Sequence, residues 1–260
     1  MTTLDKYRDY QKRTRKKSAR RSHKKTSRTK KDGFIFSIAG VHGVGKTTIY
    51  NILSKTFKDF TNIKLYPERL RAVPPVPFGS KNKQTAFRAE IHYNQQMIER
   101  NRLVSKFIKN HRENIAILDR SPLSTLIYAR ALSLPKIDYD LIDDTYRSVS
   151  WLDECVIYLE AEPKTVMSRI YKRGSLDKER QKWNEDDYQY LLRVLKKYEE
   201  IFKEFKLQKS NKFFRIWTEN KTPQEVVGEI FKIIEQKSGL QLKKKVNIPI
   251  NQSKLTNWCD

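Results

Sequence analysis

A short glycine-rich segment, "GVHGVGKT" (40–47), places a lysine and a threonine at the spacing G-x-x-x-x-G-K-T. Glycines let consecutive backbone N–H groups point inward as a nest for phosphate oxygens, and a following helix N-terminus adds a favourable dipole. In this phosphate-binding P-loop pattern the lysine reaches the β- and γ-phosphates and the threonine offers its hydroxyl to Mg²⁺. The residues expected to hold a nucleotide are Gly40, Gly43, Val44, Gly45, Lys46, Thr47 and Thr48.

A carboxylate and an arginine stand side by side in "ILDRSPLSTLIYA", where Asp119 ends the apolar run 114–119. Ligands of α/β folds bind at the carboxyl edge of the parallel sheet. We therefore expect Asp119 to bind Mg²⁺, directly or through water, together with Thr47. Arg120 is expected to hold a transferring or acceptor phosphate. An ordinary salt-bridged strand end is the alternative interpretation of such a pair.

A second carboxylate follows the run 62–67 in "LYPERLR". Glu68, with Arg69 or Arg71, is expected at the same sheet edge near the P-loop. A carboxylate close to a γ-phosphate either abstracts a proton from an acceptor hydroxyl or orders the acceptor. A loop salt bridge of little energetic consequence is the alternative.

Arginines flank a glycine in "SRIYKRGSLDKERQKW", between two predicted helices. Arg169 and Arg173 are four residues apart and share one helical face. Arginines on a mobile flap commonly meet the charge of a phosphoryl-transfer transition state and exclude water. We expect a lid at about 169–183 that carries both arginines, and a solvated basic face is the alternative.

The elements that must position these groups alternate along the chain. Apolar runs predict five strands, and each is followed by amphipathic, helical spacing. The predicted strands are 34–40, 62–67, 114–119, 154–160 and 213–217. Strand followed by helix, five times over, predicts a three-layer α/β fold of the P-loop NTPase class, with a five-stranded parallel sheet, helices on both faces and a lid segment. We expect one such domain over residues 33–238.

Charge is unevenly distributed along the 260 residues, whose formal net charge is +24. Residues 1–32 hold fourteen lysines and arginines against three aspartates and lack apolar periodicity, which predicts a basic disordered arm. Residues 239–260 are expected to form a polar C-terminal tail. The two cysteines give neither a disulfide framework nor metal-ligand spacing, and no apolar stretch is long enough for a membrane span. A cytoplasmic protein is therefore expected.

The combination of "GVHGVGKT", "DRS", "ECVIYLEAEPKTVMSRIYKRG" and "DDYQYLLRVLKKYEEIF" resembles the thymidylate kinase and deoxynucleoside kinase group of P-loop kinases over most of residues 34–237. The resemblance implies that Asp119 helps to bind Mg²⁺, and that Arg120 contacts the reacting phosphates. It also implies that Glu68 is the catalytic base and that Arg169 and Arg173 are lid arginines.

Two base-reading patterns of that group are not intact. Deoxynucleoside kinases usually carry a Phe-Gln pair in the helix that reads the base, and here Phe87 is followed by Arg88. Thymidylate kinases carry an arginine four residues after a corresponding Phe, where this chain has Ile91. "PERLR" and "LDRSPLSTLIYAR" also resemble P-loop domains of the nicotinamide-riboside-kinase type, some of whose relatives bind nucleotides in regulatory or membrane-associated proteins.

Together these patterns predict a kinase that uses ATP and Mg²⁺ and phosphorylates a nucleoside or a nucleoside monophosphate. The expected catalytic residues are Lys46, Glu68, Arg120, Arg169 and Arg173, and the expected substrate contacts are Glu68, Arg71, Arg88 and Arg120. A polynucleotide 5′-hydroxyl kinase and a non-catalytic nucleotide-binding regulator at anionic surfaces are the alternatives. The sequence leaves open whether the arm binds nucleic acid or another polyanion, and whether the chain forms a homodimer.

Overall fold

One all-parallel sheet organises the molecule, whose computed structural model describes residues 32–70, 80–172 and 184–242. Its strands are β1 (Phe34–Ala39), β2 (Ile63–Tyr66), β3 (Ile115–Asp119), β4 (Cys155–Glu160) and β5 (Phe213–Trp217). Their order across the sheet is β2-β3-β1-β4-β5. The register pairs Ile38 with Asp119 and Ala39 with Tyr158, so the central strands end along one edge.

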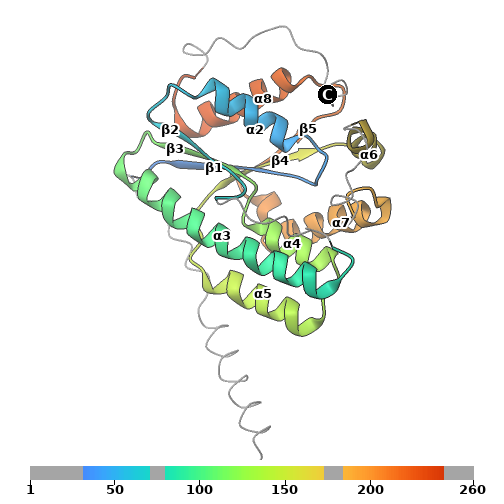
Figure 1. The fold of residues 1–260 in the computed structure, drawn as a ribbon. Helices are drawn as coiled ribbons and strands as arrows, with labels where there is room; N and C mark the ends of the chain where they lie inside the picture. Colours follow the sequence, from blue (N-terminus) through green and yellow to red (C-terminus); the bar gives the residue numbers. More distant parts are fainter. Residues whose placement is uncertain (1–31, 71–79, 173–183, 243–260) are drawn as a thin grey trace, which may run out of the picture.

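Helices cover both faces of the sheet (Figure 1). The helices of the described residues are α2 (Lys46–Thr56), α3 (Lys83–Asn110), α4 (Leu123–Ala131), α5 (Lys136–Ser148), α6 (Pro163–Lys172), α7 (Tyr188–Glu204) and α8 (Pro223–Ser238). α2 and α8 pack together on one face, and α3, α4 and α7 lie on the other, with α5 packed outside α3 and α4 (Figure 1). The predicted three-layer α/β fold with a five-stranded parallel sheet is confirmed.

The central strands read as unbroken apolar runs because helices cover them on both sides. All five residues of β3 are buried, and so are five of the six residues of β1. Side-chain caps fix where several helices begin. The Thr222 hydroxyl accepts from the Glu225 N–H in a capping box at α8, and the Asp187 carboxylate accepts from the backbone N–H of Tyr190 at α7. The α7 cap therefore sets the position from which Tyr190 enters the site described below.

The helix α5 is absent from the sequence prediction. It begins directly after Pro135 and buries Ile142 and Tyr146, which are four residues apart, while the rest of its surface is largely polar. A two-residue apolar stripe is too narrow to stand out from the predicted helices around it. The folded part of the chain also continues past α8, because Leu242 is buried and its N–H donates to Glu235.

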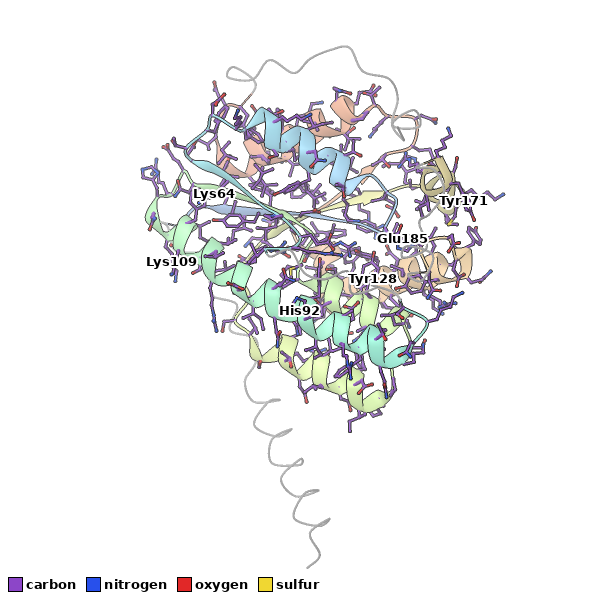
Figure 2. All side chains as sticks on the ribbon, in the orientation of Figure 1. Lys64, His92, Lys109, Tyr128, Tyr171 and Glu185 are labelled. Carbon is purple, nitrogen blue, oxygen red and sulfur yellow. The ribbon has the colours of Figure 1, made fainter. Side chains whose placement is uncertain are left out.

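The helices show no membrane-spanning character in the parts of the chain that the structure describes, since none is both long and apolar enough to cross a bilayer. Outward-facing side chains are mostly polar, as Lys64 on β2 and Lys109 at the end of α3 illustrate (Figure 2). Tyr128 and Glu185 instead point toward the interior beside the sheet edge, where the predicted site residues gather (Figure 2).

Candidate active site

The P-loop connects β1 to α2, and Gly40, Gly43 and Gly45 all have positive φ angles. Gly40 and Gly43 have φ angles of 147° and 77°, values that L side chains rarely adopt. A Cβ on Gly40 would come within 2.7 Å of the Leu159 carbonyl oxygen, and one on Gly43 within 2.6 Å of Ile170. The loop therefore lies directly against β4 and α6, and no larger residue fits at either position.

Side chains hold two carbonyl groups of the P-loop, those of Gly40 and Val41. The Tyr198 hydroxyl on α7 donates to the Gly40 carbonyl at 2.9 Å. The Lys46 ammonium donates to the Val41 carbonyl at 2.8 Å, and its side chain is buried. A glycine-rich loop before a helix N-terminus is a preformed anion site.

Arg169 holds the same loop from α6. Its guanidinium is 4% exposed and donates to the Val44 carbonyl at 3.1 Å, to the Thr218 hydroxyl at 3.0 Å and to the Thr218 carbonyl at 3.0 Å. α6 continues without a break to Lys172, so Arg169 stands inside this helix, and the remaining residues of the predicted lid, 173–183, lie outside the described residues. The expectation that Arg169 contacts the transferring phosphate is corrected, because all three hydrogen bonds tie the P-loop to the end of β5.

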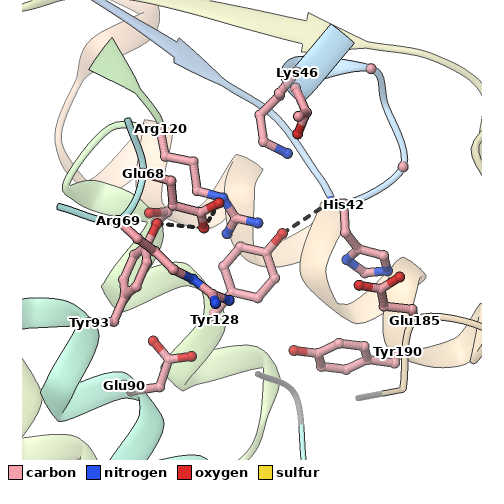
Figure 3. A pocket seen from close by; sticks show the side chains of 14 residues that line it. His42, Lys46, Glu68, Arg69, Glu90, Tyr93, Arg120, Tyr128, Glu185 and Tyr190 are labelled. Atoms are coloured by element: carbon pink, nitrogen blue, oxygen red, sulfur yellow. Dashed lines mark hydrogen bonds and ion pairs between the residues drawn. The ribbon is translucent and has the colours of Figure 1, made fainter. Parts of the chain in front are cut away.

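A cavity of ≈200 Å³ opens at the carboxyl edge of the sheet, between the P-loop and helices α3, α4 and α7 (Figure 3). Side chains that the chain supplies from far-apart segments line it, among them Lys46, Glu68, Glu90, Arg120, Tyr128 and Tyr190. The His42 N–H donates to the Tyr128 hydroxyl at 3.1 Å, which joins the P-loop to the cavity wall. The strand order places this cavity where α/β folds bind their ligands.

Glu68 and Arg120 form an ion pair inside the cavity, with 2.7 Å between Glu68 Oε1 and Arg120 Nε. The Tyr93 hydroxyl donates to the same carboxylate oxygen at 2.7 Å. Burial alone raises the pKa of Glu68, but Arg120, Tyr93 and Lys46 together hold that pKa below its ordinary value. The carboxylate is therefore ionised at neutral pH, close to the P-loop lysine.

The turn after β3 carries a strained residue that α3 holds in place. Arg120 has a φ angle of 67°, which is uncommon for a residue other than glycine. The buried guanidinium of Arg100 on α3 donates to the carbonyls of Asp119 and Arg120, both at 2.6 Å, and to the Pro67 carbonyl at 3.2 Å. Arg100 thus fixes the ends of β2 and β3 relative to each other. It stabilises an otherwise unfavourable backbone conformation at the site.

Asp119 offers one unsatisfied atom toward a cation. Its Oδ1 is buried and has no hydrogen-bond partner within the described residues, and burial followed by the charge of Glu68 raises the pKa of this carboxyl. The described residues contain no group of three or more side chains that could hold a metal by themselves. Mg²⁺ needs no such group, because it keeps waters and uses one or two carboxylates plus substrate phosphates. Asp119, with the exposed Thr47 at the start of α2, fits that requirement.

Other predicted site residues have different outcomes. Arg88 is exposed on α3 and does not line the cavity, so its expected substrate contact is corrected. The helix turns Glu90 and Tyr93 into the cavity instead. Arg71 and Arg173 lie outside the described residues.

Glu90, Arg100 and Tyr190 are three of the site side chains that were not predicted from the sequence. All three are almost fully buried. Glu90 and Arg100 stand on α3 at spacings shared with its apolar positions, such as Ala86, Tyr93 and Met97. A charged residue at a core-facing position of an amphipathic helix is the signal that could have found them.

A P-loop that meets the Glu68 carboxylate and Arg120 in one cavity, with Asp119 ending the neighbouring strand β3, defines a phosphotransferase of the P-loop class. A sequence profile of the deoxynucleoside kinase family matches residues 36–236, and the chain belongs to this family. It is therefore an ATP-dependent nucleoside or nucleotide kinase.

Individual relatives carry the same signal. The chain is 26% identical over 223 residues to a probable thymidylate kinase of Archaeoglobus fulgidus, which covers 82% of this chain and 100% of the relative. It is 26% identical over 198 residues to a probable thymidylate kinase of Methanococcus aeolicus, covering 76% and 94%. Its fold is similar to that of M. mycoides deoxyadenosine kinase with the products dCMP and dCDP, with a TM-score of 0.55, 25% identity and coverage of 78% and 100%. Candida albicans thymidylate kinase shares the fold with a TM-score of 0.59 at 20% identity, over 80% and 94% of the two chains.

Proposed function

We propose that this kinase transfers the γ-phosphoryl group of ATP to the hydroxyl of a deoxynucleoside, with Glu68 as the general base. The observation that carries the proposal is the ionised carboxylate of Glu68 inside the cavity, fixed by Arg120 and Tyr93. A base must be ionised and within hydrogen-bond reach of the proton it takes. Glu68 meets the first condition, and its position on the P-loop side of the cavity supports the second.

A hydroxyl acceptor fits this environment better than a phosphate. The carboxylate can accept the hydroxyl proton as the oxygen attacks phosphorus and the bond to the leaving ADP oxygen breaks. A monophosphate would bring two negative charges against Glu68, and like charges placed together cost several kcal/mol. Thymidylate is the monophosphate to test, since the archaeal relatives are named probable thymidylate kinases.

The remaining groups of the site serve position and charge. The backbone N–H groups of the P-loop hold the donor phosphates, and Lys46 exchanges its bond to the Val41 carbonyl for the β- and γ-phosphates. Arg120 stands beside Glu68 and meets charge that develops on the transferring group. Thr47 and Asp119 would hold Mg²⁺, which neutralises phosphate charge when bound. From the sequence, Arg173 and Arg71 remain candidates for transition-state and substrate contacts.

The test compares acceptors and Glu68 variants. Purified protein with ATP and Mg²⁺ should phosphorylate at least one of the four deoxynucleosides and leave thymidylate unchanged. Glu68→Gln should lower kcat by about 10²–10⁴-fold, while nucleoside binding followed by calorimetry stays within a few-fold. Glu113→Gln is the matched control, because Glu113 is an exposed carboxylate outside the cavity. Turnover of thymidylate alone, or full activity of Glu68→Gln, would refute the proposal.

A further inference from the structure

Glu90 on α3 faces the end of the cavity away from Lys46 (Figure 3). The residue is 2% exposed, and its carboxyl forms no hydrogen bond or ion pair within the described residues. Its oxygens are not among the fully enclosed unpaired atoms, so they face the open space of the cavity. A carboxyl held in this state inside a cavity is therefore a group that a ligand can satisfy.

Tyr190 on α7 meets the same end of the cavity from the opposite side (Figure 3). Its ring stacks on His42 of the P-loop with 5.8 Å between centroids, and the guanidinium of Arg193 lies 5.6 Å from the ring centre. The hydroxyl is buried and has no hydrogen-bond partner within the described residues. Packing thus fixes the ring and leaves its hydroxyl directed to a ligand.

The surroundings of Glu90 favour its protonated, neutral form at neutral pH. The charged and titratable groups that line the cavity besides Glu90 are His42 of the P-loop, Lys46 on α2, Glu68 and Arg69 after β2, Tyr93 on α3, Arg120 after β3, Tyr128 on α4, Glu185 before α7 and Tyr190 on α7. Burial is the main influence on Glu90; it and the charge of Glu68 outweigh the attraction of Arg120 and raise the pKa of Glu90 to about 8. A protonated carboxyl presents one O–H donor beside one carbonyl acceptor.

We propose that Glu90 and Tyr190 recognise the nucleobase of the acceptor, with the carboxylic acid of Glu90 pairing with an adjacent donor and acceptor on the base edge. This inference rests on the proposed function. Glu90 takes the base-reading role that the sequence suggested for Arg88. Arg88 lies two residues earlier on α3 and is exposed, whereas Glu90 faces the cavity.

The chemistry of the neutral acid matches that of an amide. Gln and Asn read adenine through one donor and one acceptor, whereas an ionised Glu can only accept, for example from the amino group of cytosine. Protonated Glu90 can pair with the amino group and ring nitrogen of adenine or cytosine in the same way. Ionisation of Glu90 removes the donor, so base recognition weakens as pH rises through about 8.

The test measures binding of deoxyadenosine, deoxycytidine and thymidine by calorimetry in the absence of ATP. For the nucleoside that binds wild-type protein most tightly, affinity should fall about tenfold from pH 7 to pH 9, in proportion to the neutral fraction of Glu90. Glu90→Gln keeps a donor and an acceptor at every pH. It should therefore bind within about threefold of wild type at pH 7 and show no such fall. Glu90→Leu should lose about tenfold or more at pH 7.

Further variants and ligands separate the two proposals. Tyr190→Phe should weaken nucleoside binding at all pH values, while ADP binding stays unchanged in every variant and reports an intact fold. If the nucleoside affinity does not change with pH or with Glu90→Gln, Glu90→Leu and Tyr190→Phe, base recognition by Glu90 and Tyr190 is refuted. The proposal for Glu68 is not affected by that result. Binding of thymidylate that depends on Glu90, without binding of nucleosides, overturns the hydroxyl acceptor and supports base recognition. If neither nucleosides nor thymidylate bind, both proposals fail.

Discussion

Glu68 and Glu90 line one cavity, but their surroundings shift their pKa values in opposite directions, so that Glu68 favours the ionised form and Glu90 the neutral form. Glu68 has a cation of its own, because Arg120 lies 2.7 Å away, whereas the carboxyl of Glu90 has no ion pair within the described residues. Environment alone therefore separates two chemically identical groups into a base and a neutral acid. Pairs of titratable groups pushed apart in this way mark acid–base assignments in active sites.

Replacement of Glu90 should make folding stability less sensitive to pH. The pKa of Glu90 rises from an ordinary value of 4.5 to about 8 on folding. Between these pH values the unfolded chain releases a proton that the folded protein keeps, so its contribution to stability falls as pH rises. Glu90→Gln lacks this loss, and its advantage over wild type should grow from pH 5 to pH 8. Each kcal/mol corresponds to about 2–4 °C in Tm.

Thermal unfolding of wild type and Glu90→Gln at both pH values measures this difference. Glu113→Gln, an exposed carboxyl, serves as the control and should follow wild type. A constant offset between wild type and Glu90→Gln from pH 5 to pH 8 would contradict the assignment of the neutral acid.

Asp119 provides the residue-scale test of Mg²⁺ binding. Asp119→Asn keeps the shape of the side chain and removes the charge of the unpaired Oδ1. We expect the Mg²⁺ concentration for half-maximal activity to rise about tenfold or more, whereas Glu68→Gln should lower turnover even at saturating Mg²⁺. The same response of both variants to added Mg²⁺ would mean that these two carboxylates share one role.

Which side chains form the site could be predicted only where a motif or a strand end fixed them. Lys46 was predicted from the P-loop spacing, and Glu68 and Asp119 from their places at the ends of apolar runs, where the ligand-binding edge of the sheet is expected. Arg88 and Glu90 are two residues apart on one helix, and the sequence does not state which of its polar positions faces a cavity. That depends on α4 and α7, which pack against the same space from distant parts of the chain.

At the scale of elements, α6 acts as a brace for the P-loop. Its residue Ile170 contacts Gly43, and its Arg169 bonds to the Val44 carbonyl. The sequence correctly predicted this helix, whereas the shared face of Arg169 and Arg173 stays a prediction, because Arg173 lies outside the described residues. It could not show that Arg169 faces the P-loop, because one of its hydrogen-bond acceptors, Thr218, comes directly after β5 and is far away in the sequence.

Arg169→Met should therefore weaken the donor site and not the chemical step. The substitution keeps the apolar stem and removes the three hydrogen bonds that hold the loop in shape. We expect the Kd for ATP to rise about tenfold, with kcat at saturating ATP changed only a few-fold. Lys164→Ala, an exposed cation on the same helix, is the control. A large fall in kcat with unchanged ATP affinity would restore the predicted transition-state role.

At the scale of the whole molecule, residues 1–32 carry a large share of the positive charge. This arm carries a net charge of +11 out of +24 and contains none of the site residues. Its deletion should leave nucleoside phosphorylation within about twofold, because ordinary surface changes shift stability by only about 0.5 kcal/mol. Affinity for nucleic acid should fall sharply and should depend steeply on salt in the intact chain, with a slope of about 0.9 per phosphate contacted on duplex DNA.

A salt titration of oligonucleotide binding, with and without the arm, checks this expectation beside the nucleoside kinase assay. Loss of nucleoside phosphorylation on deletion, with the domain still folded, would place the arm in the active site. Phosphorylation of 5′-hydroxyl oligonucleotides only, and only with the arm, would favour the polynucleotide kinase alternative.

The long helix α3 has a consequence for how the binding of one substrate changes the affinity for the other. It carries Glu90 and Tyr93 into the cavity and, two to three turns later, Arg100 to the carbonyls that shape the Asp119–Arg120 turn. An acceptor that restricts the motion of α3 would therefore also restrict the Asp119–Arg120 turn, which lies beside the expected donor phosphates. Thermodynamic linkage makes this effect mutual, so bound nucleoside and bound nucleotide should tighten each other by the same factor. The kinase would then favour the ternary complex over either half-filled state, which limits wasteful hydrolysis of ATP when no acceptor is present.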